Sequence, residues 1–303
     1  MSRLQTNGLR QGAGRWGALA PLVARERLFA ARMARRPATS FLYEFTRFGV
    51  KQAWACLFGA IILALLLATH AYYPRGAPLA RYDFLFLAAL TTQVMLLRLG
   101  METWEEAKII AIYHVVGTAM EVFKTHVGSW TYPEPCFFRI EGVPLFSGFM
   151  YASIGSYLAR IWRLMDFRFT HHPRLPALAA LSLAIYVNFF AHHYLPDARW
   201  LLFAAAGVLF WRTRIHYRVW RRWRSMPLLL GLCLVTLFIW LGENVGTFSA
   251  TWLYPHQAAG WSIVHAGKFG SWFLLLLVSY TLVASVHLID DRRLADGTRP
   301  FAT

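Results

Sequence analysis

Two glutamates lie inside apolar stretches of this 303-residue chain, and the sequence around one resembles the sequence around the other. The segment EVFKTHVGSWTYP, which starts at Glu121, recurs as ENVGTFSATWLYP, which starts at Glu243. The two segments share five identities at one offset of 122 residues, and the same offset aligns His70 with His192. Carboxyl and imidazole groups are the commonest acids and bases of enzymes. These four residues are therefore the candidate catalytic residues.

Polar and aromatic residues that could line a binding site follow each glutamate. A threonine comes four residues later, on the same helix face, and a tryptophan and a tyrosine come next. Because an ionised carboxylate in hydrocarbon costs about 3 kcal/mol even on lenient insertion scales, we expect both glutamates to face protein or a wet cavity. A single shared cluster is the simplest arrangement. Its candidate substrate-binding residues are Thr125, Thr247, Trp130, Tyr132, Trp252 and Tyr254.

Several chemistries suit such a cluster. A buried carboxylic acid can protonate an alkene, and aromatic faces can stabilise the resulting carbocation. Paired glutamate and histidine are also common relays in proton- or ion-coupled transport. Two histidines and two glutamates would suit zinc or iron, but no HxxxH, HxxE or ExxH pair adjoins them, so we predict no metal site and name no cofactor. The same residues could instead only fix the outer loops and form an aromatic belt.

The composition is typical of a polytopic membrane protein. Hydrophobic residues make up 57% of the chain and charged residues 15%, whereas a soluble domain carries about 25% charged residues. The net charge of +16 comes largely from arginine-rich segments beside the apolar stretches. This position favours contact with the lipid bilayer and its anionic headgroups over nucleic-acid binding. The three cysteines lie far apart and indicate neither a zinc site nor a disulfide framework.

Eight apolar stretches predict an all-α membrane protein, because each is close to the roughly 20 residues that cross a bilayer as a helix. They cover residues 52–70, 83–100, 107–125, 144–163, 176–194, 199–217, 227–245 and 269–288. With the 122-residue offset, they predict two tandem parallel four-helix repeats, over 49–170 and 171–290. We expect a basic tail over 1–48, with an amphipathic surface helix over 18–33, and a C-terminal tail over 291–303.

The arginines predict the orientation. Most of them lie in the first fifty residues, in the 160–174 and 212–225 loops and after residue 290, whereas the alternate loops hold few. The positive-inside rule then places the protein in a bacterial inner membrane with both termini in the cytoplasm. An even number of spans gives both repeats the same orientation. Under this topology the two glutamates and the two histidines lie at similar depth in the outer leaflet.

Longer segments of the chain resemble a known family. They are TWEEAK at 103–108, MEVFKTHVGSWTYP at 120–133, GVPLFSGFMY at 142–151, the 243–255 segment and GWSIVH at 260–265. Over roughly residues 45–290 the chain resembles the YoaT-like family of bacterial integral-membrane proteins, which is a domain-of-unknown-function family. The resemblance implies a multi-span membrane protein and supplies no activity.

Shorter motifs are similar to those of membrane carotenoid-pathway enzymes, the heterodimeric-type lycopene cyclases and the carotenoid hydratases. The acidic Glu121, GSWTY at 128–132 and GVP at 142–144 carry this likeness. The cyclases have paired acidic residues after the proline, but LFS follows here, which argues against cyclisation. The function we expect is an enzyme acting on a lipophilic substrate, a membrane-dissolved isoprenoid or lipid. A proton- or ion-coupled transporter and a non-catalytic membrane assembly factor remain alternatives.

Overall fold

The structure is a computed structural model that describes residues 25, 29–33, 36–74 and 76–295. The chain forms two compact units, Met1–Lys51 and Gln52–Thr303. Helix α3 (Pro37–Ala55) begins in the first unit. In this unit the ring centroids of Tyr43 and Phe29 lie 6.0 Å apart. The predicted surface helix over 18–33 and the predicted C-terminal tail over 291–303 fall largely outside the described residues.

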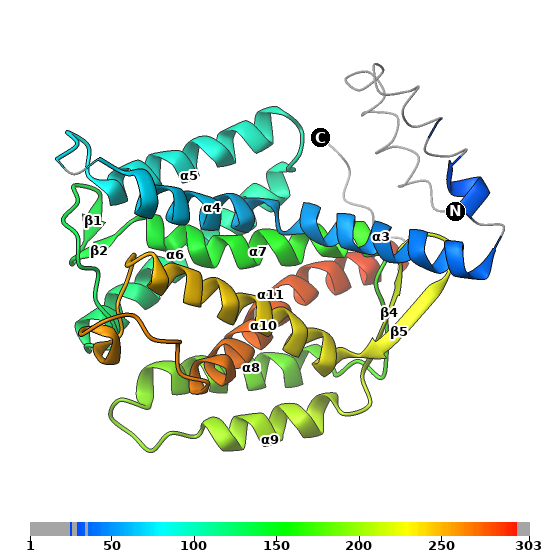
Figure 1. The fold of residues 1–303 in the computed structure, drawn as a ribbon. Coiled ribbons are helices and arrows are strands. Elements are labelled where there is room, and N and C mark those ends of the chain that lie inside the picture. Colours follow the sequence, from blue (N-terminus) through cyan, green and yellow to red (C-terminus); the bar gives the residue numbers. More distant parts are fainter. Residues whose placement is uncertain (1–24, 26–28, 34–35, 75, 296–303) are drawn as a thin grey trace. The chain divides into compact units, whose positions relative to one another are not determined.

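The helices of the second unit lie close to the stretches that hydropathy predicted (Figure 1). They are α4 (Leu57–Tyr72), α5 (Arg81–Arg98), α6 (Trp104–His126), α7 (Phe146–Met165), α8 (Leu175–Ala191), α9 (Arg199–Phe210), α10 (Leu228–Phe248) and α11 (Gly267–Ala295). Helix α7 is central, because it packs against α4, α5, α6 and α11. A second group forms where α11 packs against α8 and α10.

The prediction of eight membrane-spanning helices is wrong. Among the described residues, only α10 and the Gly267–Val286 part of α11 are long and apolar enough to cross a membrane, with a third span if α3 and α4 count as one broken helix. Helix α9 has 12 residues and reaches only about 18 Å, against a bilayer core of about 30 Å. Helix α6 is longer but buries Glu106, Glu121 and Lys124.

Two matching four-helix repeats are not seen either. Helix α5 has 18 residues, whereas its expected counterpart α9 has 12. Moreover, the segment predicted as a 212–225 loop forms β4 (Arg214–Arg218) and β5 (Trp223–Pro227). These strands pair with β3 (Arg168–Thr170) in an antiparallel sheet of order β3-β4-β5. A short hairpin of β1 (Arg139–Ile140) and β2 (Val143–Pro144) precedes α7. The regular structure of the described residues is otherwise helical, as predicted. The domain boundary at 170/171 stays a prediction.

Glycines allow α6 and α7 to pack closely, and this contact positions the candidate site. A Cβ atom on Gly148 would lie 2.6 Å from the carbonyl oxygen of His114, and one on Gly117 would lie 2.7 Å from the ring of Tyr151. Small residues at a helix crossing let the two backbones approach. The Tyr151 ring is therefore held against the α6 backbone at Gly117, which lies one turn before Glu121.

Polar residues fix the opposite end of α6. Thr103 and Glu106 form a capping box, in which Thr103 Oγ1 accepts from the Glu106 N–H at 3.2 Å and the Glu106 carboxylate accepts from the Thr103 N–H at 2.8 Å. Directly before it, Glu102 pairs with Arg160 of α7, and both side chains are fully buried. Because loss of either partner would leave an uncompensated buried charge, this ion pair ties the start of α6 to α7.

Candidate functional site

Both glutamate-bearing helices end in the same kind of turn. Two residues beyond α6, Gly128 has a φ of 72°, and two residues beyond α10, Ala250 has a φ of 51°, so both are left-handed. In each turn the following N–H donates to a carbonyl oxygen five residues earlier. This is the hydrogen-bond pattern of a Schellman C-cap. The turn sends the next few residues, which include a tryptophan and a tyrosine, back beside the helix end.

The loops that follow α6 and α10 meet at matched positions. Thr131 and Leu253 exchange both of their backbone hydrogen bonds, at 3.0 and 2.9 Å, in an isolated antiparallel bridge. The bridge brings Trp130 next to Tyr254, with ring centroids 5.9 Å apart in edge-on geometry. Both rings belong to one buried cluster with side chains of α4, α5 and α7. The residues that follow Glu121 and those that follow Glu243 therefore share one location.

Glu121 is 3% exposed, and its carboxylate accepts three hydrogen bonds. Trp130 Nε1 and Tyr132 Oη donate to Oε2, at 2.6 and 2.7 Å. Tyr151 Oη, from α7, donates to Oε1 at 2.8 Å. Each of these bonds offsets part of the cost of removing the carboxyl group from water.

Glu243 has a similar environment that differs in one donor. Tyr254 Oη donates to Oε1, as Tyr132 does to Glu121, but the indole donor is Trp272 of α11, at 2.7 Å from Oε2. Trp252 instead packs against the α10 backbone at Gly246, where it would collide with any Cβ atom. Aromatic donors thus hold both carboxylates. Those of Glu121 come from the loop after α6 and from α7, and those of Glu243 come from the loop after α10 and from α11.

Lys268, at the start of α11, lies beside the aromatic partners of both carboxylates. Its Nζ is 4.7 Å from the ring centroid of Trp130 and 4.4 Å from that of Tyr254, which is cation–π geometry. Its charge also interacts with Glu121 and Glu243. The site therefore combines two acidic groups, one ammonium group and a set of aromatic hydrogen-bond donors.

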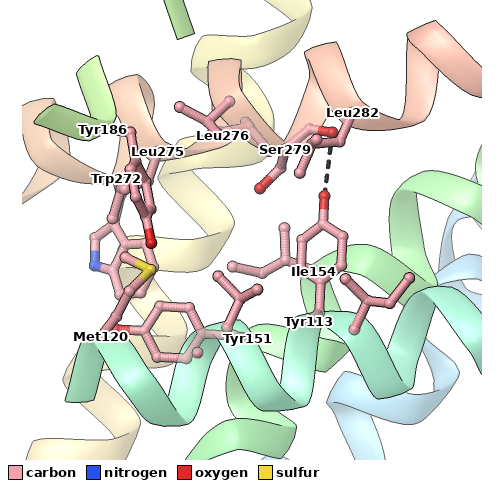
Figure 2. Close-up of a pocket in the computed structure, with 14 residues that line it drawn as sticks. Tyr113, Met120, Tyr151, Ile154, Tyr186, Trp272, Leu275, Leu276, Ser279 and Leu282 are labelled. Carbon is pink, nitrogen blue, oxygen red and sulfur yellow. Dashed lines mark hydrogen bonds between the residues drawn. The ribbon is translucent and has the colours of Figure 1, made fainter. Parts of the chain in front are cut away.

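An apolar cleft lies beside the carboxylates, between α6, α7, α8 and α11 (Figure 2). At one end of the cleft, Tyr151 and Trp272 lie near Met120 and Tyr186. Toward the other end, Tyr113 Oη donates to the backbone oxygen of Ser279 at 3.1 Å. Tyr151 and Trp272 are therefore both lining residues of the cleft and hydrogen-bond donors to the two glutamates.

The two candidate histidines lie apart from the glutamates. His70 is exposed at the end of α4, with its ring 5.7 Å from that of Phe248. His192 follows α8; its Nδ1 lies 2.8 Å from the Asn188 carbonyl oxygen, and its Nε2 lies 3.5 Å from Lys124 Nζ. Neither histidine hydrogen-bonds to a glutamate in the described part of the chain. Their catalytic role stays a prediction.

Neither candidate threonine hydrogen-bonds to a glutamate within the described structure. Thr247 Oγ1 donates to the Asn244 carbonyl oxygen and accepts from Trp261 Nε1, both at 3.2 Å. Thr125 Oγ1 is buried and has no hydrogen-bond partner within the described structure. Their proposed contact with a substrate is likewise a prediction.

Lys124 is a buried base one turn after Glu121. Its Nζ donates to the Phe189 carbonyl oxygen at 2.9 Å and lies 2.7 Å from His193 Nε2. Burial, followed by repulsion from Lys268 and Arg199, lowers the pKa of Lys124 to about 7. Burial and the Lys124 charge lower the pKa of His193 too. A neutral His193 can therefore accept the hydrogen bond of a protonated Lys124.

The tyrosines of the loops remain protonated donors at neutral pH. Burial, followed by the adjacent carboxylate, raises the pKa of Tyr132 and of Tyr254 well above the ordinary value. The arrangement can hold or move a proton between a carboxylate and the hydroxyl of Tyr151, which borders the cleft. Among the residues that the structure describes, no three His, Cys, Asp or Glu side chains are grouped as a metal ion would require.

Tyr151 and Trp272 are site residues that the sequence analysis did not predict. Both follow glycines, Gly148 and Gly270, that the 122-residue offset also aligns. An aromatic residue two or three positions after each of these glycines was the available signal. Its meaning depends on the close α6–α7 contact and on the path of α11, which a single sequence does not give.

The fold and the site define a mainly helical protein whose described residues include two candidate membrane-spanning helices, or three if α3 and α4 form one span, and a pair of buried carboxylates held by aromatic donors. The chain belongs to the family described as Protein of unknown function (DUF817), whose family model matches residues 44–280. It is similar to the Uncharacterized protein YoaT of Bacillus subtilis (strain 168), with 43% identity over 249 residues, which cover 82% of this chain and 94% of that protein. No solved structure matches. The YoaT-like resemblance is confirmed, and a relationship to carotenoid cyclases is not shown.

Proposed function

We propose that the protein is an enzyme of the bacterial inner membrane that acts on a membrane-dissolved isoprenoid or other lipid. One observation carries this proposal: Tyr151 and Trp272 line an apolar cleft and also donate hydrogen bonds to Glu121 and Glu243. A substrate in the cleft would meet these two donors first, with a carboxylate directly behind each of them.

The lining of the cleft suits a hydrocarbon substrate. Aliphatic side chains of α6 and α11 form most of its length, and burial of apolar surface is worth about 25 cal/mol per Å². In the proposed reaction, Glu121 in its acid form donates to Tyr151 Oη, and Tyr151 passes its own proton to a double bond of the substrate as it takes the proton of Glu121. The faces of Trp272 and Tyr186 stabilise the resulting cation, and Glu243, as a carboxylate, then removes a proton from it to restore a double bond.

The two candidate spans support an orientation for the site. Glu243 lies near the end of α10, and Lys268 and Trp272 lie near the start of α11, so the carboxylates are at one end of both helices. The arginine-rich β3-β4-β5 sheet adjoins the start of α10. Under the positive-inside rule the sheet and both termini lie in the cytoplasm, and the carboxylates face the outer leaflet.

A proton-coupled transporter is the second candidate. It is favoured by the ionisable groups near the carboxylates, because Lys124 lies 2.7 Å from His193 and interacts electrostatically with Lys268. Such a chain of groups could carry protons between the exposed loop after α8 and the buried carboxylates. A transporter would show pH-dependent uptake of its substrate in proteoliposomes, whereas the enzyme would change the lipids themselves.

The test compares lipid extracts of a strain that lacks the gene with extracts of strains that carry wild type, Glu121→Gln, Glu243→Gln or Tyr151→Phe. We expect the deletion to change the extract, and each variant, although present in the membrane at wild-type level, to fail to restore it. Glu105→Gln is the matched control, because Glu105 is on the same helix but its side chain is 79% exposed. Full rescue by folded Glu121→Gln and Glu243→Gln would overturn both the enzymatic and the transport proposals.

A further inference from the structure

The β3-β4-β5 sheet has two different faces. Phe169, Ile215 and Met226 alternate toward one side and pack in the hydrophobic core of α8 to α11. On the other side the register aligns Arg168 with His216 and Arg218 with Trp223, with Arg214 two residues before His216. Since side chains of a strand alternate between faces, the sheet carries three arginines on the face that points away from the core. We call Arg168, Arg214, Arg218 and Trp223 the arginine face.

Trp223 organises two of the arginines. The guanidinium carbon of Arg168 lies 4.5 Å from the Trp223 ring centroid, and that of Arg218 lies 5.1 Å from it. Arg218 also pairs with the acidic Asp166, at 2.6 Å. Stacking on an aromatic ring fixes a guanidinium while its N–H donors remain available for phosphate. Beyond Arg218, the turn between β4 and β5 adds Arg221, which stacks on Trp220 at 4.4 Å.

One candidate membrane span starts at this sheet, and the other contacts it. Strand β5 ends at Pro227 and α10 begins at Leu228, so no linker separates the sheet from the apolar helix (Figure 1). The other span contacts the sheet in its second half, where the ring of Tyr280 of α11 packs on that of Phe169 of β3. The Tyr280 hydroxyl lies 2.8 Å from His172 Nε2. A sheet that continues directly into a membrane helix is placed at the membrane–water boundary. Trp and Arg are the residues expected at that level.

We propose that the arginine face binds the anionic headgroups of phospholipids on the cytoplasmic leaflet. The proposal rests on the membrane location assigned above. It is carried by the charge of the face, by the aromatic residue that holds two guanidinium groups, and by the direct connection to α10. Arginine binds phosphate through paired N–H donors, and a basic residue at a membrane surface contributes about 1 kcal/mol of attraction to anionic lipid.

The test measures binding of phosphatidylglycerol and phosphatidylcholine to the purified full-length chain in detergent, by native mass spectrometry and lipid titration. We expect wild type to prefer phosphatidylglycerol, and Arg168→Gln and Arg214→Gln each to weaken that binding about fivefold. Arg139→Gln is the control, because Arg139 is also exposed but lies on β1, at the other end of α7. Phosphatidylcholine binding should be the same in all four proteins.

Three outcomes would overturn the proposal: no preference for phosphatidylglycerol in wild type, an equal loss in Arg139→Gln, or tighter binding to an RNA oligonucleotide than to phosphatidylglycerol. The membrane location is checked separately, by whether wild type stays in the membrane pellet after alkaline carbonate extraction. Glu121→Gln should bind phosphatidylglycerol like wild type. Failure of the headgroup site is therefore distinguishable from failure of the proposed enzymatic function.

Discussion

Removal of the Glu121 carboxylate tests whether the aromatic donors are built around it. In Glu121→Ala, three buried donors, from Trp130, Tyr132 and Tyr151, lose their acceptor. An unsatisfied buried donor costs about 1–3 kcal/mol, so for three donors we expect a loss of roughly 3–9 kcal/mol in the free energy of unfolding. Glu121→Gln keeps the shape and a carbonyl oxygen, and loses mainly the charge-assisted part of these bonds, roughly 2 kcal/mol.

Thermal unfolding of the purified variants in one detergent measures the difference. For a unit of this size, 1 kcal/mol corresponds to about 2–4 °C in Tm, so the alanine variant should melt roughly 10 °C or more below wild type and the glutamine variant roughly 5 °C below it. Glu105→Ala, at the exposed start of the same helix, should change little. If Glu121→Ala were as stable as Glu121→Gln, the three-donor geometry would be wrong.

Three further predictions concern the elements that support the site. Ala250→Gly should raise the Tm and Gly128→Ala should lower it, because a left-handed backbone costs a residue with a Cβ atom about 1–2 kcal/mol. If calorimetry gave Tm shifts of the same sign for both variants, the shared C-cap geometry would be wrong. In denaturant titration, Gly148→Ala should lower the free energy of unfolding by about 2–3 kcal/mol, because the added methyl group overpacks against α6. Gly207→Ala should raise it, because no atom lies within 4 Å of the Cβ position there. An equal response of the two variants would refute the close α6–α7 contact. The pKa of Lys124 falls from 10.5 to about 7 on folding, so the unfolded chain binds more protons between these values and stability should rise as the pH rises from about 7 to 10. Stability curves against pH should lose this rise in Lys124→Met, and an unchanged slope would show that Lys124 titrates normally.

The sequence predicted where helices form better than it predicted what they do. Apolar stretches of 18–20 residues located α4 to α11, because hydrophobic runs that must satisfy their own backbone groups favour helices. The number of membrane spans was wrong, since the same composition also describes helices that bury acidic and basic groups against one another. Glu102 and Arg160 illustrate this: Glu102 lies between two predicted stretches and Arg160 near the end of another, and only the packing of α6 on α7 pairs them.

Part of the site was visible in the sequence and part was not. Trp130, Tyr132 and Tyr254 follow the glutamates within eleven residues, so local spacing could place them near the carboxylates. Tyr151 and Trp272 reach the same groups from other helices, and β3 pairs with β4 across more than forty residues. Such long-range pairings depend on tertiary packing, which the repeat offset did not reveal. The repeat instead suggested His70 and His192 as partners, and the structure places both elsewhere.

The reciprocal bridge between Thr131 and Leu253 makes the two loops mechanically dependent on each other. Neither backbone can leave without breaking both hydrogen bonds and separating Trp130 from Tyr254. Opening of the carboxylate region from the loop side would therefore be one concerted event. In native-state hydrogen exchange, the amides of residues 131 and 253 should become labelled at the same rate.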